Sequence, residues 1–303
     1  MDVPPVVTNT TTQRWSRRRF LNGAVSVAAL GSLATACGSG ADQPASVPAS
    51  RAPASPLGGA STSPSVATAA SGVDAELISR RYQGLKPFAP APAPPAVKPI
   101  TLRASDPTVF SRVPMTDKVV FVTLDDGLVK DPRFIRMVKD FQIPITIDLA
   151  NLFISSDYRY FEKLHETGYV SIQNHTVNHP LDMPRLSASQ QFDEISGQQE
   201  ILHERYGVRP YIFRPPGGNY DETTIASAGQ AGLKGVMLWK EAMEVTDMEY
   251  QTSVHRLNPG DIILGHFRGP AQLHGETMVH MMTHLYRHIQ AQGFTVADIT
   301  KYV

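Results

Sequence analysis

The chain has almost no cysteine and no excess of charge of either sign. Cys37 is the only cysteine in 303 residues, so an intramolecular disulfide and a zinc site built from cysteines are both excluded. The 28 Lys and Arg residues balance 28 Asp and Glu residues, which leaves no basic field of the kind that holds a protein on nucleic acid. Any metal site must therefore use His, Asp or Glu, and a nucleic-acid partner is not expected.

Long hydrophobic runs are missing as well. The apolar run from Gly23 to Leu33 is too short, and too interrupted by Gly and Ser, to span a hydrocarbon core of roughly 30 Å. It follows the charged stretch Ser16-Arg17-Arg18-Arg19-Phe20-Leu21 and ends at the small residues Ala34-Thr35-Ala36. These features predict a removable signal peptide over residues 1–36, and the charged stretch resembles a bacterial twin-arginine export signal.

Cys37 directly follows the predicted cleavage site. It resembles the lipidated cysteine of bacterial lipoproteins, whereas Ala34-x-Ala36 alone is also compatible with ordinary signal-peptidase cleavage and secretion. Lipidation explains why an exported chain would keep one unpaired cysteine at this place. We therefore expect a lipid anchor on Cys37 at the outer face of the cytoplasmic membrane, with a secreted form as the alternative.

The segment that follows Cys37 has little to bury. From Gly38 to Gly72 the only charged residues are Asp42 and Arg51, and Ala, Ser, Pro, Thr and Gly dominate. Such a composition predicts disorder, and the Pro-rich residues 84–100 predict a stiffer, polyproline-like stretch after a short helix near residues 75–82. We assign residues 37–103 to a linker and residues 104–303 to the folded domain, which we expect to be a monomer.

Strands and helices alternate along the remainder of the chain. Buried strands are predicted at residues 119–124, 145–149, 170–173, 211–213, 236–239, 262–264 and 294–296. Helices are predicted at residues 133–141, 158–167, 187–205, 222–231, 250–257 and 276–292. This alternation implies parallel strands with helices outside, in either a closed barrel or an open doubly wound sheet.

Polar clusters follow four of these strands. They are Asp125-Asp126-Gly127, the stretch from Asn174 to Pro180, Arg214-Pro215-Pro216-Gly217-Gly218, and His266. Because the carboxyl ends of parallel barrel strands form one face, the clusters are expected to meet there.

The residue types in these clusters indicate a metal. His175 and His179 are four residues apart, so one helical turn would place both imidazoles on one side. One of the two adjacent carboxylates, Asp125 and Asp126, would complete three ligands and leave an open coordination position, as in hydrolytic zinc sites. The other carboxylate would remain nearby as a general base. Zinc is the expected ion, with cobalt or another divalent ion as the alternative.

Five motifs resemble, in order, the NodB-type polysaccharide deacetylase domain of carbohydrate esterase family four. Thr123-Leu124-Asp125-Asp126-Gly127 is similar to the family's Thr-Phe-Asp-Asp-Gly, and the segment from His175 to His179 is similar to its His-Ser/Thr-x-x-His. Arg214-Pro215-Pro216, Trp239 and Leu264-Gly265-His266 are similar to the third, fourth and fifth motifs. The resemblance implies a distorted seven-stranded β/α barrel and removal of N-acetyl groups from a peptidoglycan or chitin-like polysaccharide.

The resemblance also implies a role for each position. Asp125 would be the base and His266 the acid. Asp126, His175 and His179 would be the metal ligands. The positions implied for substrate and oxyanion are Arg214, which pairs with the base in the family, Pro216, Gly217, Trp239 and Leu264.

Three positions depart from the family pattern, of which Leu128, where proline is usual, is expected to matter least. Gly217 stands where an aromatic residue is usual, and Ala242 stands where the family has an Asp that orients the motif-five histidine. Glu241 or Glu244 is a candidate replacement for that Asp. Two other functions stay open at this point: a catalytically silent carbohydrate-binding protein, and a metal-dependent amidase that acts on a non-sugar amide.

A further histidine stripe is expected to be unrelated to this site. His280, His284 and His288 repeat at helical spacing, opposite an apolar face that would pack on the barrel. That face consists of Met278, Met282, Leu285 and Ile289. The three histidines are therefore predicted to point to solvent.

Overall fold

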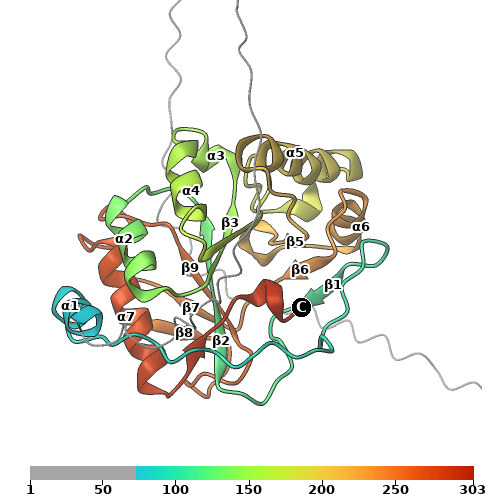
Figure 1. Ribbon diagram of the computed structural model, residues 1–303. Helices are drawn as coiled ribbons and strands as arrows, with labels where there is room; N and C mark the ends of the chain where they lie inside the picture. The colour runs from blue at the N-terminus through green and yellow to red at the C-terminus, as the bar shows by residue number, and fades with distance from the viewer. Residues whose placement is uncertain (1–72) are drawn as a thin grey trace, which may run out of the picture. The chain divides into compact units, whose positions relative to one another are not determined.

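A largely parallel sheet occupies the centre of residues 73–303, the part of the chain that the computed structural model describes (Figure 1). The strand order is β1-β6-β5-β4-β3-β2-β9-β7-β8, with β10 paired to β2, and the only antiparallel pair is β7 with β8. The strands are β1 Thr108–Phe110, β2 Val119–Asp126, β3 Ile145–Leu149, β4 Val170–Asn174, β5 Ile212–Phe213, β6 Gly235–Met237, β7 Glu241–Met243, β8 Met248–Tyr250, β9 Ile262–His266 and β10 Thr295–Val296. The sheet curls into an open half-barrel, which confirms the predicted fold class.

Helices cover the outside of the sheet (Figure 1). They are α1 Val73–Arg81, α2 Pro132–Phe141, α3 Asn151–Ile154, α4 Tyr158–His165, α5 Ala188–Tyr206, α6 Glu222–Gln230 and α7 Met278–Ala291. A capping box of Ser187 and Gln190 begins α5, which corresponds to the helix predicted at residues 187–205. Within residues 73–303, no helix combines the length and the apolar character that a membrane span requires.

Strand alternation divides the apolar residues between two sides of the sheet. Val120 and Val122 of β2 belong to a core cluster that also contains residues of α2 and α7, so they face the helices. Phe121 belongs to a second cluster with Trp239 and Leu264, which come from opposite parts of the curl. Because side chains alternate along a strand, the residues of β2 that lie two or four positions from Phe121 face the interior of the half-barrel with it.

Some predicted elements differ from the observed ones. The predicted helix at residues 250–257 is wrong: Tyr250 ends strand β8, and bends follow it. The short strands β1, β7 and β8 were not predicted. Each contains only three residues, which is too few for a period of two to stand out in the sequence.

Residues 73–103, which we call the N-terminal strap, pack against this fold. The predicted short helix is present as α1, and Ile78, Tyr82 and Leu85 are buried in the helix-side core. The ring of Phe88 lies 5.5 Å from that of Tyr286 on α7. Residues 73–103, which the sequence analysis assigns to the linker, therefore pack against the folded domain. Cys37 and the predicted signal peptide lie outside the described residues.

Candidate active site

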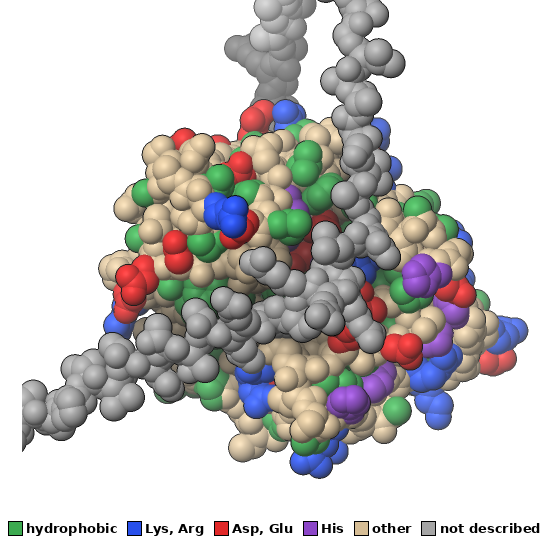
Figure 2. Space-filling view, turned by 180° about the vertical axis from the view of Figure 1, so that it is seen from behind, with side chains coloured by type: hydrophobic (Ala, Val, Ile, Leu, Met, Phe, Trp, Pro, Cys, Tyr) green, Lys and Arg blue, Asp and Glu red, His purple; other side chains and the backbone are tan. Residues whose placement is uncertain are grey.

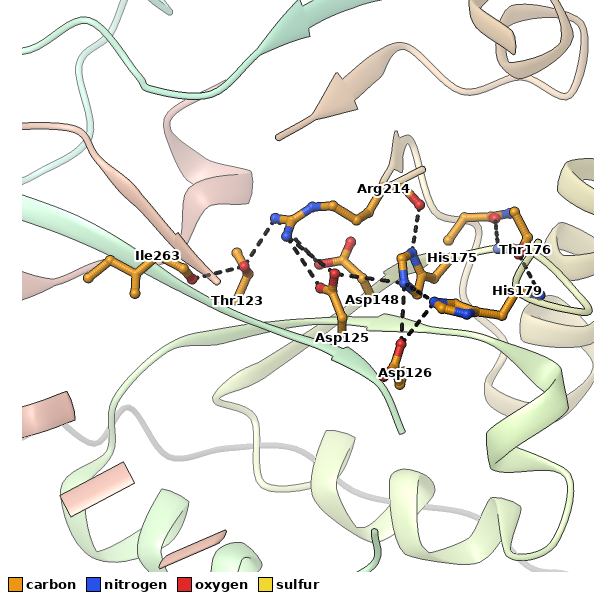
Figure 3. Close-up of polar contacts among 10 residues, drawn as sticks. Thr123, Asp125, Asp126, Asp148, His175, Thr176, His179, Arg214 and Ile263 are labelled. Carbon is orange, nitrogen blue, oxygen red and sulfur yellow. Dashed lines mark hydrogen bonds and ion pairs between the residues drawn. The ribbon is translucent and has the colours of Figure 1, made fainter. Parts of the chain in front are cut away.

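Three side chains converge where β2 and β4 end (Figure 3). Oδ1 of Asp126 lies 3.1 Å from Nε2 of His179 and 3.5 Å from Nε2 of His175, and the two Nε2 atoms are 3.2 Å apart. Within residues 73–303 this is the only group of three or more His, Cys, Asp or Glu residues close enough to hold a metal ion. These are the three ligands that the family resemblance implied.

The backbone turns sharply to present these side chains. Asp126 has φ 77° and His179 has φ 54°, both in the left-handed region that non-glycine residues rarely adopt. Gly127 follows with φ 88°, and a Cβ atom there would lie 2.5 Å from Cγ2 of Ile154. Only glycine therefore fits the turn that follows Asp126.

A second layer of contacts holds the two imidazoles. Nδ1 of His175 donates to the carbonyl of Arg214 at 2.6 Å, which leaves the Nε2 lone pair facing Asp126. The backbone N–H of His179 donates to Oγ1 of Thr176 at 3.1 Å, and Phe153 meets the His179 ring edge-to-face at 5.2 Å. Both rings are thus oriented by protein groups before any ligand binds.

The charges at this point favour a cation. Burial alone would raise the pKa of Asp126, but the imidazoles of His175 and His179 and the nearby His266 hold that pKa well below its ordinary value. Oδ1 of Asp126 is buried without a hydrogen-bond donor among the described residues. Tetrahedral zinc ligands with bonds near 2.05 Å lie about 3.3 Å from one another. The two imidazole nitrogens and one carboxylate oxygen therefore fit a divalent metal ion.

Arg214 is fully buried and connects the other polar groups of the interior (Figure 3). Its Nη1 donates to Oδ1 of Asp125 at 3.3 Å, and its Nη2 donates to Oγ1 of Thr123 at 3.0 Å. Asp125 Oδ2 lies 3.7 Å from Nε2 of His175, so this second carboxylate borders the ligand cluster without belonging to it.

Asp148 is a member of this network that the sequence analysis missed. It is completely buried on β3, and its Oδ2 lies 3.8 Å from Nη2 of Arg214. Burial raises the pKa of Asp148 to about 7, with Arg214 opposing the shift and Asp125 adding to it. The signal in the sequence is a single carboxylate inside an otherwise apolar buried strand.

His266 ends β9 directly opposite Asp125 in the parallel register of β2 and β9. In the register of β7 and β9, Ala242 is the partner of Leu264. Glu244 follows directly after β7, and its carboxylate is one of the charged groups that act on His266. Glu244 is therefore the candidate substitute for the carboxylate that is missing at Ala242.

The two candidate glutamates have different surroundings. Oε2 of Glu244 accepts from Nη1 of Arg268 at 2.9 Å, while its Oε1 and Nδ1 of His266 are both buried without a hydrogen-bond partner among the described residues. Glu241 points to the other side of the strand, where burial and the neighbouring Asp261 raise its pKa to about 9. Of the two, only Glu244 faces the site.

Several charged groups act on His266. Burial lowers the pKa of this imidazole, and the guanidinium of Arg268 lowers it further. The carboxylates of Asp126, Asp125 and Glu244 act in the opposite direction without reversing the shift. The protonated ring is therefore scarcer at neutral pH than for an ordinary histidine.

Trp239 and Leu264 line the interior next to Arg214. The guanidinium carbon of Arg214 lies 5.4 Å from the centre of the Trp239 ring, and a Cβ on Gly218 would lie 3.0 Å from Cη2 of that ring. Leu264 is buried in the same cluster. These contacts place both apolar side chains beside the polar network.

The loop after β5 carries the remaining two positions. Pro216 is buried and Gly217 is exposed in the short 3-10 helix η2, Pro216–Gly218. Gly217 has φ 61°, and a Cβ there would lie 3.2 Å from Nδ2 of Asn219. That same Nδ2 donates to the carbonyl of Leu181 at 2.6 Å, which ties this loop to the one after β4.

Comparisons with known proteins show which proteins this chain resembles. A sequence model described as polysaccharide deacetylase matches residues 112–236. An uncharacterised protein of Streptomyces coelicolor is 33% identical over 198 residues, which cover 65% of this chain and 78% of that protein. The peptidoglycan-N-acetylglucosamine deacetylase of Bacillus cereus is 23% identical over 202 residues, which cover 63% of this chain and 92% of that protein. A CE4 family pseudoenzyme from Bacillus anthracis, at 18% identity, shares the fold with a TM-score of 0.54 over 65% of this chain and 69% of its own.

Proposed function

We propose that this chain, which belongs to the polysaccharide deacetylase family, hydrolyses N-acetyl groups of an extracellular or cell-wall glycan with the help of a divalent metal ion. The observation that carries the proposal is the adjacency of two different carboxylates. Asp126 faces two imidazoles, whereas Asp125 is held by a buried arginine. A site for a metal and a site for a base therefore lie side by side.

Asp126, His175 and His179 would hold the ion. A divalent ion bound there lowers the pKa of water and polarises an acetyl carbonyl. Asp125 then accepts the proton of the attacking water at its carboxylate, and Arg214 keeps that carboxylate oriented. The backbone N–H at Gly217 is the candidate donor to the oxyanion, which forms on the acetyl carbonyl oxygen when water attacks the carbonyl carbon.

The second proton transfer falls to His266. Its ring donates a proton to the departing amine nitrogen, which would otherwise be a poor leaving group. Glu244 would be the positioning residue for this step, which is supported by its buried Oε1, unpartnered among the described residues, and by its charge influence on His266. Trp239 and Leu264 form the apolar wall for the acetyl methyl group.

The rim of the site would meet the sugar with aliphatic side chains. Leu128, Leu152 and Leu181 are exposed and follow β2, β3 and β4, and Leu181 lies over the loop of Gly217. This leucine surface would take the place of the aromatic ring that the family pattern has at the position of Gly217. The apolar face of a sugar ring would therefore rest on leucine instead of on an aromatic ring.

The place of action that we propose is the outer face of the cytoplasmic membrane, with the chain exported and anchored by a lipid on Cys37. An N-acetylated glycan outside the cell is then the substrate.

Release of acetate from a panel of N-acetylated glycans tests the function. The zinc-loaded protein is incubated with peptidoglycan and with chitin oligomers, and acetate is measured against the Asp125→Asn variant. Acetate release by the wild type alone supports a deacetylase. Binding of a glycan without acetate release would identify a carbohydrate-binding protein instead, and hydrolysis of non-sugar amides alone would identify an amidase.

A further inference from the structure

A second pair of histidines, on α7, repeats the arrangement of the two active-site imidazoles. His280 and His284 lie one turn apart, and their Nε2 atoms are separated by 3.2 Å. The Nε2 atoms of His175 and His179 are also 3.2 Å apart. The ring centres are 4.6 Å apart in the α7 pair and 4.8 Å apart in the active-site pair. Both separations suit two nitrogens bonded to one metal ion, which lie about 3.3 Å apart at a tetrahedral zinc.

A carboxylate sets the orientation of the first ring. Glu276 lies one turn before His280 on the chain, and its carboxylate contacts Nδ1 of that imidazole. A neutral ring that carries its proton on Nδ1, toward this carboxylate, has its Nε2 lone pair free for a metal ion. The carbonyl of Arg214 takes the corresponding place at Nδ1 of His175 in the active site. A carboxylate behind an imidazole is a frequent outer partner of metal-bound histidine.

The second ring is held against the first. His284 meets His280 edge-to-face, with an angle of 78° between the ring planes. Figure 2 shows histidine side chains gathered on the side of the molecule that α7 forms, with carboxylates beside them. Both rings of the pair are partly exposed, so an ion can reach them from solvent.

The third histidine of the stripe has another role. Nε2 of His288 contacts the hydroxyl of Tyr250 and lies 2.7 Å from Nε2 of Gln292. It is therefore engaged with strand β8 and with the end of its own helix. The α7 pair thus offers two ligands, fewer than the three of the active site.

We propose that His280 and His284 form an accessory site for a divalent transition-metal ion, oriented by Glu276. Two imidazoles favour Cu²⁺, Ni²⁺ or Zn²⁺ over Mg²⁺ and Ca²⁺, which prefer oxygen ligands. Water completes the coordination sphere, so this site is weaker than the three-ligand site. It shares no residue with the candidate active site and does not depend on the proposed deacetylase activity.

Zinc titration by calorimetry at neutral pH tests the accessory site. All versions of the full chain carry Cys37→Ser, so that no thiol contributes. The parent is expected to bind one tight and one weaker zinc ion. His280→Ala with His284→Ala loses only the weaker ion and keeps acetate release, whereas His175→Ala with His179→Ala loses only the tight one. His288→Ala is the matched control on the same helix and keeps both.

Glu276→Gln is expected to weaken the second zinc ion by roughly 10- to 100-fold. If circular dichroism shows that the double alanine variant on α7 is unfolded, His284→Gln replaces it and is expected to lose the same ion. A single zinc ion in the parent chain would overturn the proposal. Retention of both ions when the α7 pair is replaced would overturn it equally.

Discussion

Asp125 and Asp126 are neighbours in the chain with different environments. Strand alternation sends Asp125 into the interior beside Arg214, and the left-handed turn at Asp126 brings the second carboxylate to the two imidazoles. In the proposed mechanism one pair of identical residues would supply both a base and a metal ligand, because the backbone conformation gives the two side chains different environments.

Asp125→Asn should abolish turnover and keep the zinc ion, whereas Asp126→Ala should lose both. Loss of a general base lowers the rate by roughly 10²- to 10⁴-fold, while loss of one of three ligands removes the ion itself. Zinc per chain and acetate release, measured on the same preparations, check both expectations. Equal loss of zinc in the two variants would contradict this division of roles.

Glu244→Gln should move the alkaline limb of kcat/KM to lower pH. His266 acts while protonated, and its pKa is already lowered, so activity falls early as the pH rises. The Glu244 carboxylate raises that pKa, and its removal lowers the pKa further and shortens the active range at the alkaline end. The measurement is the pH profile of kcat/KM.

Glu241→Gln is the control for this experiment, because Glu241 faces the opposite side of β7, toward Asp261. Its alkaline limb should coincide with that of the wild type. If Glu241→Gln shifts the alkaline limb and Glu244→Gln does not, Glu241 and not Glu244 is the partner of His266.

The sequence alone was sufficient to predict those residues of the candidate site that belong to contiguous motifs. His175 and His179 could be predicted as a pair because four residues separate them on the chain. Asp148 could not, since a single Asp in a buried strand gives no pattern, and its function arises from Arg214, which lies 66 residues further along. Glu244 was distinguished from Glu241 only by its surroundings near His266, which depend on tertiary structure.

At the scale of elements, the turn after β2 determines where Asp126 points. Gly127→Ala should destabilise the fold by several kcal/mol, because the new Cβ would lie 2.5 Å from Ile154 and 2.9 Å from Phe161. Zinc binding should be lost as the turn shifts. Thermal unfolding and zinc content measure the two effects.

Gly168→Ala separates this clash from the cost of the backbone conformation. Gly168 has φ 79°, and no atom lies within 4 Å of a Cβ built there. The substitution should therefore cost only about 1–2 kcal/mol, the strain of an alanine in the left-handed region, and leave zinc binding intact. Similar losses in the two variants would mean that packing at Gly127 is unimportant.

The buried apolar strands were predicted, including the short β5, β6 and β10, whereas β1, β7 and β8 were missed. The bounds of β3 were predicted as observed, because Ile, Thr and Leu favour strands and the segment is buried. Strand β7 consists of Glu, Ala and Met, which favour helices, and it forms a strand only because β9 and β8 pair with it. Local preference was overridden there by tertiary pairing.

At the scale of the molecule, the N-terminal strap is part of the folded unit. A fragment that starts at residue 104 loses the burial of Ile78, Tyr82 and Leu85 and exposes the partners of Phe88. Each buried apolar side chain contributes roughly 1.5–3 kcal/mol, so we expect a loss of at least about 3 kcal/mol. The Tm should fall by about 6–12 °C.

A fragment that starts at residue 73 is the matched control and should unfold at the temperature of the full chain. Differential scanning calorimetry of the three proteins gives the comparison. Equal Tm values for all three would show that the strap adds no stability.

The anchor is tested separately, since Cys37 lies outside the described residues. The mature protein should partition into the detergent phase through its lipid, and a Cys37→Ser form should not. Recovery of the wild type in the aqueous phase, with an unmodified thiol in the mass spectrum, would rule out the lipid.

The strap also determines how the domain responds to a pull. Its contacts are spread along the chain: Tyr82 bonds Asp140, Thr295 bonds the carbonyl of Ala89, and Tyr302 bonds that of Pro92. A force applied at residue 73 would therefore reach these contacts before it acts on β1, the first strand along the chain. The strap would detach and lengthen first, so that the strands keep their pairing at forces that already release the strap.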